Sequence, residues 1–351
     1  MINIVLCGGN GERLWPLSNA SMPKQFIKLF DDKSLFQLTI KRNSQVCDSQ
    51  IIVSNSELHF LALEQQQELK KFDSKYLLEP VGRNTAPAIA LACASVDPQE
   101  IVLITPSDHI IRNEEEYKKV IKKAETLASE DYLVTFGIIP SFAETGFGYI
   151  EALDDNVKAF HEKPDFNTAV KYIETTNHYW NSGMFCFKAG VFLNELKKHS
   201  NDIYIESIDA IKSSTKETIV TENKLEYETI RIRHTDMLRI PNTSVDYAVM
   251  EKSSRVKVVI SDINWSDIGS FDALYDELEK DSNGNTKDIN HISINSKNNF
   301  IFSGDKQIAT IDIQDLIIVS NKNSILITKR GSSQKIKTIV ERLKDISDTI
   351  S

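Results

Sequence analysis

A glycine-rich segment directly follows the apolar run Ile2–Cys7 and carries residue types that suit phosphate binding. It reads Gly8-Gly9-Asn10-Gly11-Glu12-Arg13-Leu14. Glycine lets backbone N–H groups approach phosphate oxygens because no Cβ stands in the way, and the Arg13 guanidinium can donate several hydrogen bonds to an anion. Lys24 would add a second cation. A tight turn without a ligand explains three glycines about equally well, so the segment alone leaves both interpretations open.

Two better-known phosphate motifs are excluded. The pattern GxxxxGK[ST] fails because the sequence contains no Gly-Lys pair. The pattern GxGxxG fails because Leu14 stands where a third glycine would allow close packing of a helix. The segment therefore predicts a different kind of phosphate loop, if it binds phosphate at all.

Single acidic residues follow other apolar runs. Glu79 ends one such run, and a carboxylate there could accept two hydrogen bonds from the N1–H and N2 amino group of guanine. Asp108 follows Ile101–Thr105. Each of these residues also has a plainer interpretation, Glu79 as an exposed residue before a proline turn and Asp108 as a turn former. A third acidic residue, Asp267, could cap a helix together with Ser266. The residues alone do not decide between these alternatives.

The elements that must position these residues alternate between strands and helices. Alternation of this kind indicates a mostly parallel sheet with helices on both faces, and ligands of such sheets bind at the carboxyl ends of the strands. The loops Gly8–Lys24, Pro80–Asn84 and Pro106–His109 all follow predicted strands. The predicted strands are Ile2–Cys7, Ile51–Ser54, Tyr76–Glu79, Ile101–Thr105 and Leu133–Gly137, and the predicted helices are Ser34–Val46, Ser56–Lys71, Thr85–Ser95 and Asn113–Ala128.

The rest of the chain predicts a sheet extension and a second domain. Strands at Gly148–Ala152, Val157–His161 and Met184–Phe187 would extend the sheet over a second substrate. After residue 283, short alternating runs with many Asn, Ser, Asp and Gly residues predict a small β-rich, β-helix-like domain that ends in a helix. We therefore expect an α/β domain at 1–283 and a C-terminal β-rich domain at 284–351.

Composition excludes several classes of protein. The chain has 351 residues, of which 41% are hydrophobic, and a formal net charge of −9. An acidic chain offers no broad grip on nucleic acid or anionic lipid, and no run approaches the ~20 apolar residues of a membrane span. The four cysteines show no metal-binding spacing. We expect a cytoplasmic protein without nucleic-acid or membrane partners.

Six blocks of sequence together resemble the sugar-nucleotide pyrophosphorylases, and five of them the mannose-1-phosphate guanylyltransferase branch. The resemblance runs from residue 1 to about residue 330. The blocks are Gly8–Ser18 with Pro23-Lys24-Gln25-Phe26, Glu79–Pro87, Pro106-Ser107-Asp108-His109, Phe160-His161-Glu162-Lys163-Pro164, Trp180–Phe185 and Trp265–Ser270. Asn10, Glu12, Phe147 and Phe271 depart from the commoner residues of the family.

The resemblance implies a GT-A-like, Rossmann-related fold and a set of roles. It implies that Mg²⁺ binds to two aspartates, that basic residues hold both reacting anions, and that GTP and mannose 1-phosphate are the substrates. The resemblance implies that Gly8, Gly9, Gly11, Arg13 and Lys24 bind the nucleotide phosphates and that Glu79, Asn84 and Ser107 bind the base and ribose. It also implies that Asp108 and Asp267 bind the metal, that Lys163 binds the acceptor phosphate, and that Gly148, Glu162 and Asn181 contact the sugar.

The acceptor phosphate is already ionised near neutral pH, so the implied reaction needs alignment and charge neutralisation more than a side-chain base. Two alternatives stay open: another sugar 1-phosphate, or a non-catalytic regulatory paralogue that binds a nucleotide sugar. Longer relatives carry an isomerase domain of the cupin type, which needs clustered histidines. His291 is the only histidine after residue 234, so we expect no isomerase activity. A homodimer is possible.

Overall fold

The structure is a computed structural model that describes residues 1–9, 12–70, 74–220 and 226–350, and it divides the chain into two compact units. The first unit comprises Met1–Gly8, Gln37–Ser107 and Ile111–Trp265. The second comprises Gly9–Phe36, Asp108–Ile110 and Ser266–Ser351. The domain boundary that we placed near residue 283 falls inside the second unit and stays a prediction.

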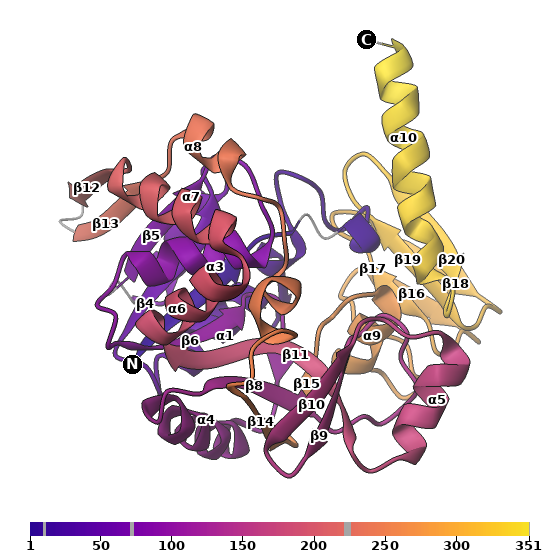
Figure 1. Ribbon diagram of the computed structural model, residues 1–351. Coiled ribbons are helices and arrows are strands. Elements are labelled where there is room, and N and C mark those ends of the chain that lie inside the picture. Colours follow the sequence, from indigo (N-terminus) through magenta and orange to yellow (C-terminus); the bar gives the residue numbers. More distant parts are fainter. Residues whose placement is uncertain (10–11, 71–73, 221–225, 351) are drawn as a thin grey trace. The chain divides into compact units, whose positions relative to one another are not determined.

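An 11-stranded mixed sheet forms the first unit (Figure 1). The strands from β13 through β5, β4 and β1 to β6 are parallel to one another, whereas β11, β10 and β9 pair only in antiparallel fashion. In sheet order the strands are β12 (Thr215–Val220), β13 (Glu226–Arg231), β5 (Ser74–Glu79), β4 (Ser49–Asn55), β1 (Ile2–Cys7), β6 (Ile101–Pro106), β11 (His178–Lys188), β8 (Leu133–Ile138), β14 (Val256–Ser261), β10 (Asn156–His161) and β9 (Tyr149–Leu153).

Helices cover both faces of this sheet, as the alternation of elements predicts. Along β6, Val102 and Ile104 belong to one hydrophobic cluster and Leu103 to another, because successive side chains point to opposite faces. Helices α3, α6 and α7 pack on the first cluster and α4 on the second. The helices are α1 (Leu35–Asn43), α2 (His59–Glu68), α3 (Thr85–Ala94), α4 (Glu114–Ser129), α5 (Phe166–Glu174), α6 (Ala189–His199), α7 (Asn201–Lys212), α8 (His234–Arg239) and a π-helical turn, η3 (Asp246–Met250).

A buried polar network fixes the two central strands. Asn3 on β1 donates to the Leu103 carbonyl at 2.9 Å and to Thr105 Oγ1 at 3.0 Å. Asn43 donates to both Asn3 and Thr105, and its own Oδ1 accepts from the Tyr117 hydroxyl at 2.8 Å. Buried polar groups stabilise a unique arrangement only when they are paired, as these are. The network therefore holds β1 and β6 in register just before the loops that follow them.

The second unit contains a short β-helical stack, which agrees with the predicted β-rich C-terminal region. The register pairs His291 with Ile308 and Phe300 with Ile317, so parallel strands repeat every 17 residues. Buried asparagines join successive turns, with Asn299 Nδ2 donating to Asn285 Oδ1 at 2.9 Å. The elements are β2 (Lys28–Phe30), β3 (Lys33–Ser34), α9 (Phe271–Glu277), β16 (His291–Ile294), β17 (Phe300–Phe302), β18 (Ile308–Ile311), β19 (Leu316–Ser320), β20 (Ile325–Lys329), α10 (Ile336–Ile350) and the 3-10 turns η1 (Glu12–Leu14), η2 (Lys24–Phe26) and η4 (Ser333–Lys335).

Two further strands, β7 (Ile110–Ile111) and β15 (Trp265–Ser266), each include residues assigned to both units.

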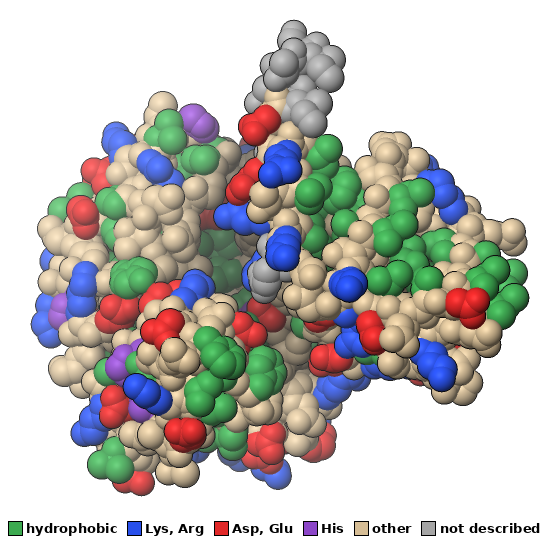
Figure 2. Space-filling model, turned by 90° about the vertical axis from the view of Figure 1, so that its right-hand side faces the viewer, with side chains coloured by type: hydrophobic (Ala, Val, Ile, Leu, Met, Phe, Trp, Pro, Cys, Tyr) green, Lys and Arg blue, Asp and Glu red, His purple; other side chains and the backbone are tan. Residues whose placement is uncertain are grey.

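On the surface, basic and acidic side chains are interspersed over the face shown in Figure 2. Among the residues drawn in colour there, no continuous basic stripe forms.

Candidate active site

Three residues predicted to contact the nucleotide lie at one edge of the sheet in the first unit. Gly8 directly follows β1, Glu79 is the last residue of β5, and Ser107 comes immediately after β6. Because β1 pairs in parallel with β4 and β6, and β4 with β5, these strands all end on the same side. This is the edge at which open α/β sheets bind ligands.

The carboxyl group of Glu79 is largely buried and incompletely paired. Its Oε1 atom is inaccessible to solvent and has no hydrogen-bond partner in the part of the chain that the structure describes. Burial raises the pKa of Glu79 to about 8, because a carboxylate loses its hydration when water is removed. The alternative of an exposed glutamate before a proline turn is therefore wrong. A buried acceptor of this kind favours a ligand that brings N–H donors.

Ser107 and Asn84 differ in how much of their side chains is committed to the fold. Ser107 is fully buried, and its Oγ finds no partner among the described residues, while its N–H donates to the Leu6 carbonyl at 3.1 Å. Asn84 caps helix α3, since its Oδ1 accepts from the Thr85 N–H at 2.8 Å. This capping role was not predicted from the sequence, and it leaves the amide NH₂ of Asn84 and the second lone pair of its Oδ1 for a ligand.

The glycine-rich segment is described except for Asn10 and Gly11, so the role predicted for Gly11 lies outside the described residues. Gly9 has φ of +92°, a conformation that glycine adopts without strain, and an added Cβ there would meet no described atom within 4 Å. In η1 the Arg13 side chain is exposed, whereas the neighbouring Leu14 is buried in the core of the second unit. Leu14 therefore anchors the segment and leaves the guanidinium in solvent.

Asp108, Lys24 and Asp267 come together in the second unit. The Lys24 ammonium lies 2.9 Å from Asp108 Oδ2, and it donates to the backbone carbonyls of Asp267 at 2.7 Å and Ile268 at 3.3 Å. Burial alone would raise the pKa of Asp108, but the charges of Lys24 and His109 outweigh it and hold that pKa below its usual value. A cation thus already sits against the Asp108 carboxylate and the Asp267 backbone.

The structure excludes a helix-capping role for Asp267. Ser270 caps α9 instead, because its Oγ accepts from the Ala273 N–H at 3.1 Å. Asp267 Oδ1 accepts from the Gly269 N–H at 2.9 Å, and an added Cβ at Gly269 would come within 2.5 Å of Asp267 Oδ2. Between them Ile268 has φ of +48°, which is a genuine outlier for a β-branched residue. Strain of this kind often accompanies functional sites.

The residues predicted for the acceptor form a cluster in the first unit. An added Cβ at Gly148 would lie 3.0 Å from Glu162 Oε2 and 3.7 Å from the Asn181 Cβ, so a side chain there would crowd both residues. The Asn181 N–H donates to the Gly148 carbonyl at 2.8 Å. Lys163 forms an ion pair of 2.5 Å with Glu162 and has φ of 36°, a conformation that few residues other than glycine adopt.

Asp246 joins this cluster, although the sequence analysis did not single it out. Asn181 Nδ2 donates to Asp246 Oδ1 at 2.9 Å. Burial raises the pKa of Asp246, with Asn181 opposing the shift through its hydrogen bond, and the charges of Glu162 and Lys163 also act on it. One signal could have revealed it, because Asp246 stands beside the apolar run Ala248–Met250, where a carboxylate needs a partner.

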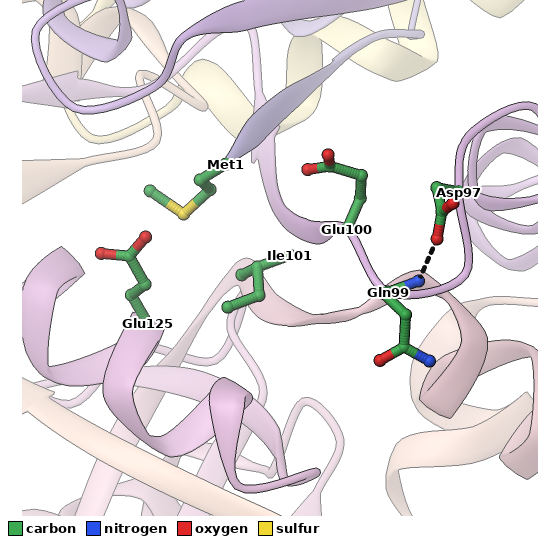
Figure 3. Close-up of a pocket in the computed structure, with 6 residues that line it drawn as sticks. All are labelled: Met1, Asp97, Gln99, Glu100, Ile101 and Glu125. Atoms are coloured by element: carbon green, nitrogen blue, oxygen red, sulfur yellow. Dashed lines mark hydrogen bonds between the residues drawn. The ribbon is translucent and has the colours of Figure 1, made fainter.

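A cavity of about 430 Å³ lies at the other edge of the same sheet, where β1 and β6 begin (Figure 3). Its lining residues are Met1, Asp97, Gln99, Glu100, Ile101 and Glu125. Three carboxylates line it, and anionic phosphates would be repelled there. This cavity does not suit a nucleotide.

Two family profiles match the chain. The nucleotidyl transferase profile covers residues 2–284, and the mannose phosphate isomerase/GMP-like β-helix profile covers residues 289–343. Together they span most of the sequence and match the large α/β unit and the C-terminal β-helical stack in type.

Individual proteins agree with this result. "Mannose-1-phosphate guanylyltransferase 2" of Escherichia coli O157:H7 is 38% identical over 363 residues, covering 98% of this chain and 73% of the relative. A solved structure described as mannose-1-phosphate geranyltransferase from Thermus thermophilus has a TM-score of 0.84 and 26% identity, over 98% of this chain and 99% of that one. Another, described as mannose-6-phosphate isomerase from Helicobacter pylori, has a TM-score of 0.67 and 39% identity, over 76% of this chain and 99% of that one.

The chain therefore belongs to the nucleotidyl transferase family and, within it, to the mannose-1-phosphate guanylyltransferases. Nucleotidyltransferases of this kind generally use a divalent metal ion. Within the described residues, no helix combines the length and apolar character needed to cross a membrane.

Proposed function

We propose that this chain transfers a guanylyl group from GTP to mannose 1-phosphate, giving GDP-mannose and pyrophosphate. The relatives named for this activity support the substrate pair. The observation that carries the proposal is the convergence of two segments on the ammonium of Lys24, which pairs with the Asp108 carboxylate and donates to the backbone carbonyl of Asp267. A carboxylate, a cation and a second aspartate on the adjoining segment are groups that a nucleotidyltransferase can use to hold a metal ion beside a triphosphate.

Guanine recognition is assigned to Glu79. Its ionised carboxylate would accept hydrogen bonds from the N1–H and N2 amino group of the base, which would satisfy the buried Oε1 atom. Adenine presents an acceptor at N1 and would leave the carboxylate unpaired in a buried setting, which is costly. Ser107 Oγ and the amide of Asn84 are assigned to the base or ribose.

Mg²⁺ is the metal that we assign to Asp108 and Asp267. Two carboxylates and phosphate oxygens suit a hard ion that prefers oxygen ligands. Bound there, the ion would neutralise charge on the triphosphate. Lys24 contacts both segments in the structure. In this scheme its ammonium turns to the triphosphate together with Arg13 and the N–H groups of Gly8, Gly9 and Gly11.

The acceptor is assigned to the cluster around Gly148. Lys163 would exchange its ion pair with Glu162 for the phosphate of the sugar, while Glu162 and Asn181 would bind hydroxyl groups. Asp246 holds the amide of Asn181 through its hydrogen bond and so orients it. The absence of a side chain at Gly148 would leave room for the hexose ring.

The reaction needs no covalent enzyme intermediate. An oxygen of the acceptor phosphate attacks the α-phosphorus of GTP, a new P–O bond forms, and the bond between the α-phosphorus and the bridging oxygen of pyrophosphate breaks. The protein supplies alignment and positive charge, which contribute most of the rate enhancement in phosphoryl chemistry of this type. Pyrophosphate leaves with the electron pair of the broken bond.

The same chemistry on another sugar 1-phosphate and a non-catalytic nucleotide-sugar sensor are the alternatives. Assay of four nucleoside triphosphates against a panel of sugar 1-phosphates, following pyrophosphate with and without Mg²⁺, distinguishes them. We expect release with GTP and mannose 1-phosphate only when Mg²⁺ is present. Release with a different sugar would replace the acceptor, and no release with any pair would favour the sensor. Fructose 6-phosphate included as a substrate tests the expected lack of isomerase activity.

A cytoplasmic location and a homodimer stay predictions of the sequence analysis. Size-exclusion chromatography with light scattering tests the homodimer, for which we expect twice the mass of the chain. Localisation of the tagged protein in cell fractions tests the first prediction.

A further inference from the structure

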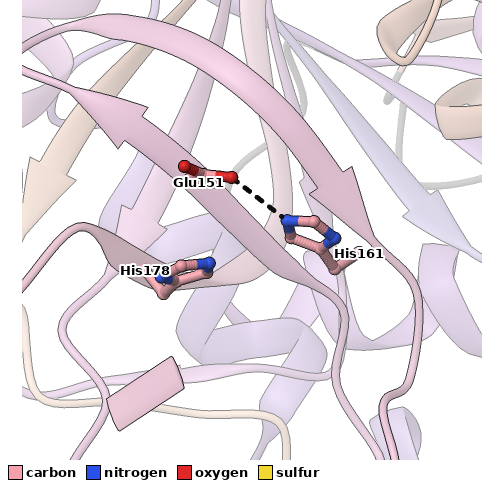
Figure 4. A group of neighbouring side chains, drawn as sticks. All are labelled: Glu151, His161 and His178. Carbon is pink, nitrogen blue, oxygen red and sulfur yellow. Dashed lines mark ion pairs between the residues drawn. The ribbon is translucent and has the colours of Figure 1, made fainter. Parts of the chain in front are cut away.

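Outside the residues assigned to the reaction, one group of side chains has the composition of a transition-metal site. Glu151, His161 and His178 each offer a ligand atom, and these atoms all lie within 4.8 Å of one another. Figure 4 shows the three side chains around a common space, with the ion pair between Glu151 and His161 as a dashed line. Two imidazoles and one carboxylate form a donor set that zinc accepts.

The sheet itself brings these residues together. Strand β9 pairs with β10 on one side and with β11 on the other. Glu151 on β9 lies directly opposite His178 on β11, while His161 on β10 lies opposite Tyr149, two residues before Glu151. Side chains two residues apart on a strand share a face, so all three point to the same side of the sheet. The cluster is a consequence of strand register and not of a mobile loop.

The hydrogen bonds of His178 leave its Nε2 free of a proton. Nδ1 lies 3.0 Å from Asn177 Oδ1 and 2.7 Å from Thr175 Oγ1. The Thr175 hydroxyl donates its one proton to the Tyr172 carbonyl, so its oxygen can only accept from the imidazole. Both neighbours therefore fix the proton on Nδ1. Outer partners that select the tautomer in this way are typical of histidines that bind metals.

The environment favours the neutral form of His178. Burial lowers its pKa, with Glu151 opposing and His161 reinforcing the shift. Asn177 also donates to Glu151 Oε1 at 3.5 Å, so one amide orients both His178 and Glu151. The Tyr172 ring stacks on His178 with 4.2 Å between ring centroids and lies 5.0 Å from His161, so it covers both imidazoles.

Of the three residues, His161 has the ring nitrogen that most clearly lacks a hydrogen-bond partner. Its Nε2 is buried and makes no hydrogen bond to any residue that the structure describes, although it lies 3.5 Å from Glu151 Oε2. That distance is close to the separation of about 3.4 Å between ligand atoms in a tetrahedral zinc site, as bond lengths near 2.0–2.1 Å require. The ligand atom of His178 lies within 4.8 Å of the other two, and side-chain rotation on metal binding would bring it to the same separation.

We propose that Glu151, His161 and His178 bind a divalent transition metal of the zinc class, with water as a fourth ligand. The imidazole ligands distinguish this site from the proposed Mg²⁺ site, where the donors are oxygen atoms. Bound there, the metal cross-links β10, β9 and β11. These strands, or the residues directly adjoining them, carry Gly148, Glu162 and Asn181. Metal binding itself does not depend on the function proposed above.

Cobalt(II) provides the test, because its visible absorption reports coordination number. The full chain is treated with a chelator, dialysed, and titrated with Co²⁺ in the presence of excess Mg²⁺. We expect one equivalent to bind with the intense absorption of a four-coordinate ion, and Zn²⁺ to displace it and raise the melting temperature. His161→Gln and Glu151→Gln should each weaken binding at least about tenfold.

His199→Gln is the matched control, because His199 also lies near a carboxylate, Glu195, at 3.2 Å but has no third ligand atom among the described residues. We expect this variant to bind Co²⁺ like the original chain. The unfolding transition of each variant without metal shows that it is folded. Absence of four-coordinate absorption in the original chain, or unchanged binding in folded His161→Gln and Glu151→Gln, would overturn the proposal.

Discussion

Replacement of Glu79 by glutamine separates guanine recognition from folding. Glutamine keeps the size and one carbonyl oxygen of the side chain but removes the negative charge. It also places an NH₂ donor where the second carboxylate oxygen would face the base. In the structure, the buried Oε1 atom of Glu79 lacks a partner among the described residues, so the substitution removes no hydrogen bond of that atom within the protein.

The expected loss in use of GTP follows from the strength of charged hydrogen bonds. A hydrogen bond to a charged group contributes about 1.5–3 kcal/mol. Loss of one such bond in the transition state lowers kcat/KM by roughly ten- to a hundred-fold. We therefore expect Glu79→Gln to reduce kcat/KM for GTP by that factor while changing kcat/KM for ATP far less.

Stability should change in the opposite direction. The folded-state pKa of Glu79, about 8, lies above the value of an unfolded glutamate, so the native state binds this proton more tightly. The resulting stabilisation is complete below the unfolded pKa near 4.3 and is lost as pH rises through about 8. Since the side chain is partly accessible, the loss is of the order of a few kcal/mol at most. Glutamine has no proton to lose.

The assay combines kinetics with thermal unfolding at pH 5 and pH 9. We expect Glu79→Gln to match the original chain at pH 5 and to exceed its melting temperature at pH 9. We also expect the rise of kcat/KM for GTP toward pH 8 to disappear. Glu130→Gln, at an exposed glutamate, should change neither property. Retained selectivity for GTP over ATP in Glu79→Gln, or an equal stability difference at both pH values, would refute the reasoning.

Four other substitutions test the remaining assignments. Asp108→Asn should reduce Mg²⁺-dependent pyrophosphate release by about a thousand-fold or more, and exposed Asp305→Asn should not; a near-normal rate in Asp108→Asn would remove the metal assignment. Lys163→Gln should raise KM for the sugar phosphate about tenfold or more by removing a charge pair, compared with Lys158→Gln on the preceding strand β10; equal KM values would contradict the acceptor site. Asp246→Ala should raise that same KM and leave KM for GTP unchanged, because Asn181 loses its acceptor; a change in KM for GTP alone would place Asp246 elsewhere. Ser270→Ala should lower the free energy of unfolding by about 1 kcal/mol in urea denaturation, whereas no loss would mean that the cap does not stabilise α9.

The first half of the fold could be predicted well because periodicity and turn chemistry agree there. The strands at Ile2–Cys7 and Tyr76–Glu79 and the helix that begins at Thr85 occur where the apolar runs indicate them. Antiparallel pairing of β11 with β6 and β8 was harder to foresee, since a buried strand is apolar in either direction. The 17-residue repeat was not predicted from the sequence. Successive turns of a β-helix repeat the alternation of inward-facing and outward-facing side chains more than they repeat residue identity.

Residues at strand ends could be assigned to the site, but residues brought in by long-range packing could not. Glu79 ends one apolar strand and Asp108 lies two residues after another, so the sequence marks them. Asp246 reaches Asn181 across 65 residues of sequence, so the apolar run beside Asp246 indicates only that this carboxylate needs a partner and does not identify Asn181 as that partner. His161 and His178 meet only because β9 lies between their strands. Register between distant strands is set by the folded sheet and is not visible in spacing.

The most direct measurement is phosphorus-31 NMR of the purified chain with GTP, mannose 1-phosphate and Mg²⁺. We expect the three signals of GTP and the signal of the sugar phosphate to be replaced by the coupled signals of a nucleotide sugar and that of pyrophosphate, in equal amounts, and only with Mg²⁺. Unchanged spectra, or release of inorganic phosphate and GDP in place of pyrophosphate, would contradict transfer of a guanylyl group.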